Sequence, residues 1–339
     1  MIDTAPLLSD LNNRVSSGSS FRPSEVDLSK PFIQTEQSEE EDHAEALVNE
    51  EWQRKIETLT PRFPTDQNVV AIDSTELVLG YIPGGFVAAL RASLVTKTPK
   101  DNTHHLERHG PFLIAISGEN KDELFQTMHR RVYGIAASSP APTLEKTLDR
   151  VRNLFERYLQ LEVARKSHES LILLDGSLIG GTVDSPGFFV RKIIDTAAEN
   201  TNSIAALSKS TELTLEQSRR NILSLLEGIP GPCCIGDIRN QIRHGSDRYL
   251  GQVYVTRLTT TGEPFRIDLP ENTAKPHDEI LNSLAGLAGN YGYPEELKLA
   301  HMTCVFSAIE VLELQAAAIA LHGLVMKEEA DIRPKIFPL

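Results

Sequence analysis

The order of the apolar segments constrains the fold of this chain more than any other feature of the sequence. Three strand-like segments, 68–74, 77–82 and 86–95, follow one another with tight turns, one of them at Pro83-Gly84-Gly85. Successive strands with short turns predict an antiparallel meander. After residue 143 the pattern changes to alternating helices and buried strands, which predicts parallel strands. The sequence therefore predicts an α/β protein with one mixed sheet and flanking helices.

The remaining elements are predicted from hydrophobic periodicity. The helices are expected at 120–133, from Thr143 to Lys166, at 186–199, 213–227, 276–289 and 294–325. The strands are expected at 112–117, 171–175, 203–208, 251–258 and 264–269. The last two of these helices follow the last strand and form an additional C-terminal segment.

Acidic residues gather at the start of the chain. The formal net charge is −13, and residues 1–50 hold eleven Asp and Glu against three Lys and Arg. This segment also lacks sustained periodicity, so we expect an acidic, flexible arm over 1–50, with a helix near 42–58 leading into a domain over 51–339. The remainder is nearly balanced in charge, which argues against non-specific coating of DNA but leaves room for a local basic groove.

Cysteine content and hydropathy narrow the class of protein. There are three cysteines, two of them adjacent, which excludes a disulfide framework and a four-cysteine zinc site. We expect no membrane helix, since no apolar run approaches about 18 residues without charges, and no secretory signal at the N-terminus. The expected location is the cytoplasm. No Walker motif and no strand-linked G-x-G-x-x-G occurs, which disfavours an NTPase or a dinucleotide enzyme.

Two aspartates stand at the ends of apolar strands. Asp73 follows Val69-Val-Ala-Ile, and Asp175 follows Leu171-Ile-Leu-Leu. Each alone is compatible with a turn. Together they are less readily explained by turns, because ligands gather at the carboxyl edge of an open α/β sheet. A carboxylate in the first strand and another ending a central strand is the layout of ribonuclease-H-like nucleases.

The long helix offers a third carboxylate, with two candidates. By helical projection at about 100° per residue, Glu162 lies on the apolar face and Glu156 points away from it. The shorter rise per residue of a helix than of a strand instead brings Glu156 closer to the level of Asp175. The direction in which the side chains point favours Glu162 as the third acid, and Glu156 remains the alternative.

A bound metal ion would offset the cost of burying these carboxylates. Oxygen ligands of this type suit Mn²⁺ or Mg²⁺ better than Zn²⁺. Carboxylates around such ions can promote phosphodiester cleavage. The sequence therefore indicates a metal site built on Asp73 and Asp175.

Three further residues have both a functional and a structural interpretation. His301 lies two turns into a helix that starts at Pro294, as a core histidine or as a ligand and proton carrier. Lys209 follows the strand 203–208 and either meets a phosphate or faces water. Tyr254 either points into the same cleft or packs in the core. The basic stretch 239–244, with Arg239, Arg243 and His244, is a candidate nucleic-acid groove.

Three motifs in this order resemble the NurA family of nucleases. They are Ala71-Ile-Asp73-Ser, Leu173-Leu-Asp175-Gly-Ser-Leu and Tyr293-Pro-x-x-Leu-x-x-Ala-His301, within a resemblance that spans about 65–325. The resemblance implies a ribonuclease-H-like fold, a homodimer, and Mn²⁺-dependent 5′→3′ exonuclease activity with endonuclease activity on single-stranded DNA. It also implies work with a hexameric HerA-type helicase in DNA end resection and double-strand break repair.

Carried over by residue, the resemblance makes Asp73, Asp175 and His301 the metal ligands. The helical acid is Glu162 or Glu156, and Lys209 and Tyr254 are the expected DNA contacts. One departure is Ser74, where the family usually has Gly after the first Asp. It keeps a second interpretation open, a catalytically inactive partner that guides DNA to a translocase. A metal-dependent RNase is a third, because this fold does not choose between DNA and RNA.

Overall fold

The computed structural model describes residues 25–27, 47–49, 55–99, 103–243, 245–289, 291–322 and 325–327. Most of the expected acidic arm and His244 lie outside the described residues. The main sheet contains nine strands in the order β3-β10-β11-β12-β8-β7-β4-β5-β6. Their bounds are β3 Ile56–Thr58, β4 Asn68–Ile82, β5 Gly85–Lys97, β6 His104–Ser117, β7 Ser170–Asp175, β8 Ser203–Ser208, β10 Cys233–Ile235, β11 Gln252–Arg257 and β12 Pro264–Leu269.

The order and direction of the strands confirm the ribonuclease-H-like layout. Strands β4, β5 and β6 form the antiparallel meander, and β7 and β8 then add in parallel on the other side of β4. Strands β12, β11, β10 and β3 continue the sheet with antiparallel pairing. The carboxyl ends of β4, β7 and β8 consequently point the same way.

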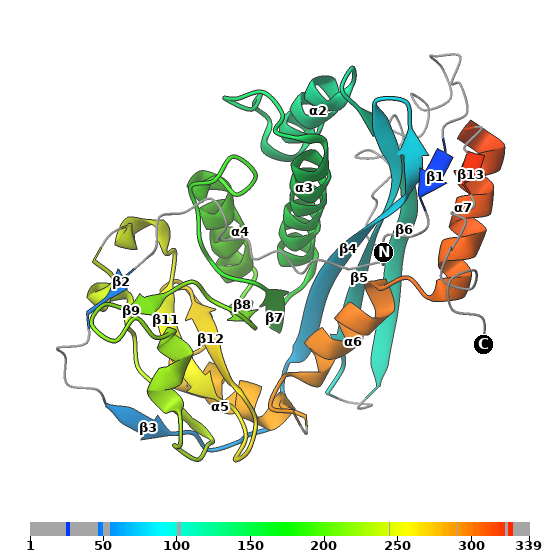
Figure 1. The fold of residues 1–339 in the computed structure, drawn as a ribbon. Helices are drawn as coiled ribbons and strands as arrows, with labels where there is room; N and C mark the ends of the chain where they lie inside the picture. Colours follow the sequence, from blue (N-terminus) through cyan, green and yellow to red (C-terminus); the bar gives the residue numbers. More distant parts are fainter. Residues whose placement is uncertain are drawn as a thin grey trace, which may run out of the picture.

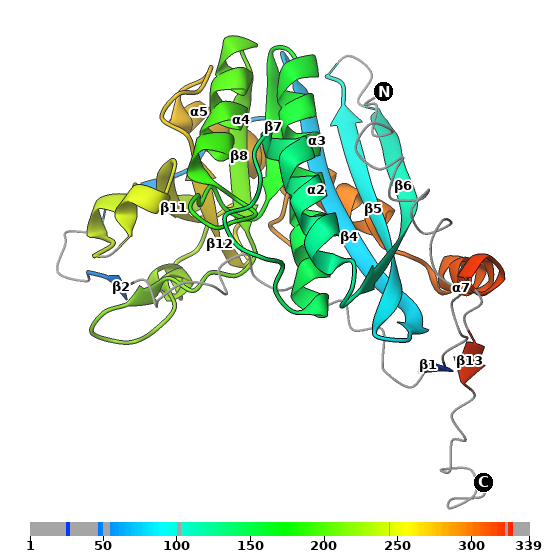
Figure 2. The same cartoon turned by 90° about the horizontal axis from the view of Figure 1, so that it is seen from above.

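Helices cover both faces of the sheet (Figures 1 and 2). One face carries α2 (Lys121–Tyr133), α3 (Leu144–Lys166) and α4 (Gly187–Glu199). The opposite face carries α5 (His277–Leu287), α6 (Glu295–Cys304) and α7 (Ala308–His322). Because side chains alternate along a strand, even-numbered residues of β4 such as Ile72 pack towards α3. Odd-numbered ones such as Ala71 pack towards α5 and α6.

Several predicted elements differ from those observed. The segments 68–74 and 77–82 are one strand, β4, because β5 pairs with it along its whole length, with an irregularity at Val78/Gly80. Strand β6 begins at His104 rather than at Phe112. Where a helix was expected near 42–58, the described residues form β2 (Leu47–Val48) and β3.

The helix predicted at 213–227 is wrong. This segment forms β9 (Thr214–Leu215) and the short 3-10 helix η1 (Ile222–Leu226). Arg219 adopts a φ of 56° and the Leu215 amide donates to the Arg220 carbonyl, so the chain turns between the two apolar groups. The remaining small elements are β1 (Glu25–Asp27), β13 (Val325–Lys327), η2 (Arg239–Gln241) and η3 (Ser246–Arg248).

The predicted helix 294–325 is broken into α6 and α7. The break lies at 305–307, where Arg91 from β5 donates to the Val305 carbonyl, stacks on the Phe306 ring and pairs with Glu310. Residues 295–320 reach the length and mean hydropathy, 1.5, of a membrane-crossing helix, which the sequence analysis did not predict. One third of that window is buried inside the protein, and the length and hydropathy alone are weak evidence for a membrane span.

Candidate active site

Three parallel strands present charged side chains at one edge and on one face of the sheet. Asp73 lies in β4, Asp175 ends β7, and Lys209 follows β8. The preceding alternate residues, Ala71, Leu173 and Leu207, are buried together beneath α5 and α6. Alternation therefore turns the two carboxylates and the ammonium towards the same side, where α6 covers them.

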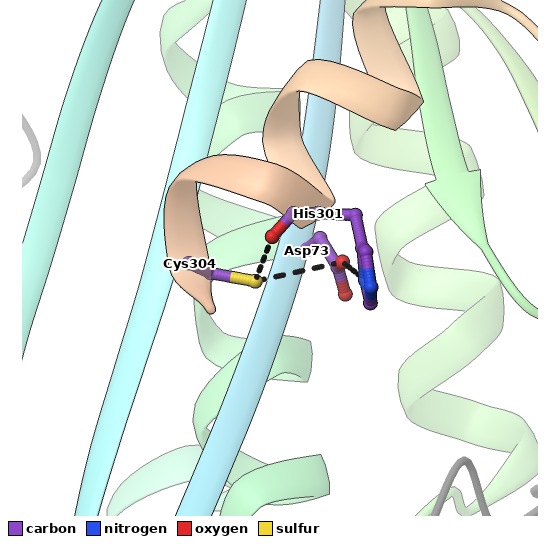
Figure 3. Close-up of side chains that lie close together, drawn as sticks. All are labelled: Asp73, His301 and Cys304. Atoms are coloured by element: carbon purple, nitrogen blue, oxygen red, sulfur yellow. Dashed lines mark hydrogen bonds and ion pairs between the residues drawn. The ribbon is translucent and has the colours of Figure 1, made fainter. Parts of the chain in front are cut away.

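His301 from α6 completes the contacts of Asp73 (Figure 3). Its Nδ1 lies 2.8 Å from Asp73 Oδ2, and the other oxygen, Oδ1, accepts a hydrogen bond from the Ser74 amide. The hydrogen bond to Asp73 raises the pKa of His301, against the opposing effect of burial. The pair therefore favours a protonated imidazole beside a buried carboxylate.

Cys304 reaches the same carboxylate from the next turn of α6. Its Sγ lies 3.5 Å from Asp73 Oδ2 and donates to the His301 carbonyl at 3.2 Å. Residues three apart on a helix share a face, which explains how His301 and Cys304 converge on one oxygen. The sequence analysis assigned no role to Cys304, although this spacing was visible.

Asp175 has its own pair of partners. Lys209 Nζ lies 2.8 Å from its Oδ2, and the Tyr293 hydroxyl lies 3.2 Å from its Oδ1. Burial raises the pKa of Asp175, and the neighbouring charge of Asp73 raises it further, while Lys209 acts in the opposite direction. Lys209 thus lies beside Asp175, whereas the sequence analysis left open whether it meets a phosphate or faces water. Tyr293 opened a motif in the sequence, but its own side chain was given no role.

The helical acid nearest this edge is Glu156. Its side chain is 4% exposed and accepts hydrogen bonds from the Ser74 hydroxyl and from Gln160. Arg152, one turn earlier, lies 3.4 Å from it. Ser74 and Asp73 point to opposite faces of β4, so Glu156 approaches this strand from the α3 side.

The facing argument that favoured Glu162 is wrong. The Glu162 carboxylate pairs with Arg165 and Lys166 of its own helix, at 2.7 and 3.5 Å. Helix α3 packs against the sheet and also against α2 and α4, so buried residues surround most of its circumference. A projection onto one apolar face therefore misjudged Glu156, whereas the comparison of rise along helix and strand placed it correctly.

The sequence itself decides the family. The model of the NurA domain matches residues 67–306, well over half of the chain. The chain belongs to the NurA family. Residues 67–306 contain β4, β7 and α6, and with them all three motifs on which the resemblance rests.

Solved structures add the following likenesses. The NurA nuclease from Sulfolobus solfataricus has 17% identity and a TM-score of 0.47, covering 79% of this chain and 87% of that one. A second NurA crystal structure has 10% identity, a TM-score of 0.47 and coverages of 78% and 90%. Endonuclease V from Streptomyces avermitilis has 12% identity, a TM-score of 0.39 and coverages of 78% and 88%. With scores this low, none of these likenesses carries an argument of its own. No curated protein matches the sequence.

Tyr254 does not join the two aspartates of this NurA chain. Its hydroxyl bonds to Gln252 and to His277, and the His277 ring bonds in turn to the Pro270 carbonyl. Gln252 pairs with Leu269, and Pro270 and His277 follow it, so these partners lie at the end of β12 away from Lys209. The structural interpretation of Tyr254, as a residue packed beneath α5, therefore describes its position.

The basic stretch is engaged in ion pairs in its described part. Arg239 pairs with Glu271 at 3.1 Å, and Arg243 pairs with Glu216 at 2.6 Å. Neither contacts the aspartates.

The donor atoms at the edge fit a divalent cation. Ligand atoms of Asp73, His301 and Cys304, from β4 and α6, all lie within 4.8 Å of one another. Asp175 adds a carboxylate from the adjacent strand β7, near enough for the charge of Asp73 to raise its pKa. Carboxylate and imidazole ligands are those that Mn²⁺ accepts, and Mg²⁺ prefers the oxygens alone. A bound cation would also offset the mutual repulsion that helps to raise the pKa of Asp175.

Proposed function

We propose that this NurA-family protein is a metal-dependent DNA nuclease. The observation that carries the proposal is the pair of carboxylates, Asp73 and Asp175, on one face of adjacent parallel strands, with His301 bonded to the first. A divalent cation and a proton carrier near the scissile bond promote phosphodiester hydrolysis, and this group of side chains supplies ligands and a proton carrier.

In this proposal Asp73, Asp175 and His301 hold Mn²⁺, with Mg²⁺ as an alternative. The ion, when bound, supplies Lewis-acid activation of water and stabilises the charge that develops on phosphate. Glu156 takes the place first given to Glu162 as the helical acid, because it lies beside Ser74 at the same level of β4.

The other side chains have roles that follow from charge and position. Lys209 donates from an ammonium group at the same edge, and this positive charge favours an approaching phosphate. Tyr293 and Lys209 orient the two oxygens of Asp175. His301 has one of two roles. It is the third ligand, with a neutral imidazole, or it stays off the ion and, with its pKa raised by Asp73, holds a proton that it can donate to a leaving oxygen.

The finer features of the activity are proposed from membership of the family. They are 5′→3′ exonuclease and single-strand endonuclease activity, Mn²⁺ as the preferred ion, and a homodimer that works with a HerA-type hexameric helicase in DNA end resection and break repair. The proposed location is the cytoplasm, at the nucleoid when on DNA. Tyr254, whose hydroxyl points away from Asp175, is not retained in the proposed DNA contact; Lys209 is.

Cleavage of end-labelled DNA tests this function. Single- and double-stranded DNA, labelled at the 5′ or the 3′ end, is incubated with the full chain in Mn²⁺, Mg²⁺ or EDTA, with Asp175→Ala beside it. We expect release of the 5′ label in Mn²⁺, none in EDTA and none with Asp175→Ala. Glu162→Gln serves as the matched control, since it removes a carboxylate from α3 without touching the edge. An Asp175→Ala protein that cleaves at the wild-type rate would contradict the proposal.

Ser74 favours one second candidate, an inactive protein that guides DNA to a translocase. Its hydroxyl holds Glu156 by a hydrogen bond that the usual glycine of the family cannot make. Thermal unfolding with Mn²⁺ separates the candidates. At a free Mn²⁺ concentration of about 100 times Kd, a functional metal site adds about 2.7 kcal/mol to the free energy of unfolding, whereas a vestigial site adds little. A metal-dependent RNase is tested by RNA of the same sequence in the cleavage assay.

A further inference from the structure

The side chains on the α6 side of Asp73 include a sulfur ligand that the proposed Mn²⁺ site does not use. Cys304 is fully buried, and its Sγ ends on the same oxygen, Asp73 Oδ2, as His301 Nδ1. A carboxylate oxygen, an imidazole nitrogen and a thiol within 4.8 Å of one another form a set with a softer character than the carboxylate pair.

The distance between the sulfur and the oxygen matches a tetrahedral ion. Zinc bonds of about 2.3 Å to sulfur and about 2.0 Å to oxygen place those two ligands about 3.5 Å apart in a tetrahedron. The observed distance from Cys304 Sγ to Asp73 Oδ2 is 3.5 Å. The same geometry puts nitrogen and oxygen ligands about 3.3 Å apart. His301 Nδ1, at 2.8 Å, would therefore withdraw by about half an ångström.

An ion has access to these three ligands, and a neighbouring hydrogen bond orients one of them. The His301 side chain is 35% exposed, so an ion can reach the buried thiol past the imidazole. The second oxygen of Asp73 is fixed by the Ser74 amide, which orients the carboxylate. The two ligands of α6 lie on one helical face, one turn apart, so no rearrangement of the helix is needed.

We propose that Asp73, His301 and Cys304 form a binding site for Zn²⁺ and similar thiophilic divalent ions, and that occupation of this site inhibits the protein. Binding releases the thiol proton of Cys304 and the Nδ1 proton of His301 to solvent and forms a thiolate–metal and an imidazole–metal bond, with no change of oxidation state. Zinc stands above manganese in affinity for nitrogen and sulfur ligands. An ion held there occupies Asp73 and His301, which the proposed Mn²⁺ site also needs. The binding itself does not depend on the proposed nuclease function, whereas the inhibition does.

Cobalt is the probe for binding, because a Co²⁺–thiolate bond produces a charge-transfer band in the near ultraviolet. The full-length protein is titrated with Co²⁺ and then with Zn²⁺. We expect a band with the wild type that Zn²⁺ removes. The double variant Cys233→Ser/Cys234→Ser is the matched control and keeps the band, since both thiols are buried in β10, outside the Asp73, His301 and Cys304 group. Cys304→Ser loses the band.

Two further measurements keep the proposal testable if Cys304→Ser does not fold. Asp73→Asn and His301→Gln each remove one ligand and should weaken Co²⁺ binding by at least about tenfold, since even outer-shell partners of a metal cost 10- to 100-fold in affinity. A wild-type protein without a band at saturating Co²⁺, or a band that survives in Cys304→Ser, overturns the site.

Inhibition is measured separately. Zn²⁺ is added to the cleavage assay in excess Mn²⁺, and each protein is compared with its own rate without zinc. We expect the wild type to lose activity at lower Zn²⁺ than Cys304→Ser does. Equal sensitivity of the two proteins contradicts the inhibitory role. Absence of cleavage by the wild type, with the Co²⁺ band intact, contradicts the nuclease function and the inhibitory role but leaves the binding site standing.

Discussion

Nδ1 of His301 lies 2.8 Å from Oδ2 of Asp73, although 228 residues separate them in the chain. The contact joins the middle of α6 to the central strand β4. Helix α6 therefore contributes a side chain to the site in addition to covering it. Changes at either residue should therefore affect chemistry before they affect folding.

We expect His301→Ala to lower the cleavage rate by about 10²-fold or more, the range that a positioned proton carrier contributes. Met302 is the matched control, because it is the next residue and its side chain is exposed, so Met302→Ala should keep the wild-type rate. Single-turnover cleavage with a thermal melt of each variant measures both effects. A fully active His301→Ala protein would remove His301 from the proposed site.

Glu156→Gln should reduce cleavage by at least tenfold, whereas Glu162→Gln should change it by less than twofold. Glu156 is buried and bonded to Ser74 next to Asp73. Glu162 makes ion pairs within α3 that contribute a few tenths of a kcal/mol. Rates of both variants under the same Mn²⁺ concentration provide the comparison. The reverse order of effects would restore Glu162 as the helical acid.

Lys209→Met should move the acidic limb of the pH–rate profile to higher pH. Lys209 lowers the pKa of Asp175 against the effect of burial, so its loss lets that pKa rise further, and the carboxylate forms only at higher pH. The profile is measured as cleavage rate against pH. Lys192→Met, on the exposed side of α4, is the control and should leave the limb in place. A limb that moves to lower pH contradicts the assignment.

Glu296→Gln should destabilise the protein by about 3–5 kcal/mol, the cost of breaking a buried ion pair. Glu296 is fully buried, and its Oε1 lies 3.1 Å from Lys97 Nζ and 3.4 Å from His104 Nε2, which joins the start of α6 to β5 and β6. Glu295→Gln, at the neighbouring exposed position, should cost less than 1 kcal/mol. Urea unfolding gives both values, and equal midpoints for the two variants would show that the buried pair contributes nothing.

Glu310→Gln should remove a stabilising contribution that depends on pH. The hydrogen bond from Arg91, followed by the Ser307 amide, lowers the pKa of Glu310 to about 2. A carboxyl group whose pKa is lower in the folded state stabilises the fold at pH values above its ordinary pKa of 4.5. This stabilisation is lost as the pH falls towards 2. The variant should therefore be less stable than the wild type at pH 7, with the difference closing between these two pH values. Thermal midpoints at pH 7 and pH 3 measure it; a difference that grows in acid contradicts the ion pair.

Sequence patterns predicted the parts of the fold in which one local rule dominates. Buried strands 171–175 and 203–208 and the long amphipathic helix were confirmed, since their periodicity is strong. The segment 213–227 has apolar residues at helical spacing, yet turns at Arg219, because its two apolar groups pack as separate elements. Local periodicity cannot detect that competition.

The site was predictable where strand order determined it. Asp175 and Lys209 lie where β7 and β8 end at one edge, as expected for an open α/β sheet. Asp73 lies on the neighbouring strand β4, which continues to Ile82 instead of ending there as predicted. The choice between Glu156 and Glu162 depended on how many neighbours surround α3, which no single-helix projection contains. For Tyr254 the sequence left a cleft and a core interpretation open, and the core interpretation holds; alternation alone could not decide, since it gives the face of a strand but not the direction of a long side chain along it.

The alternation of β4 also limits how this gene can change. Asp73 faces α6 and Ser74 faces α3, and this alternation holds from Asn68 to the irregularity at Val78/Gly80, beyond which the two faces are exchanged. Insertion or deletion of one codon before Asp73 would exchange the two faces and place the carboxylate against α3 and the hydroxyl against His301. A change of one residue between Asn68 and Asp73 would therefore need a compensating irregularity like the one that β4 carries at Val78/Gly80.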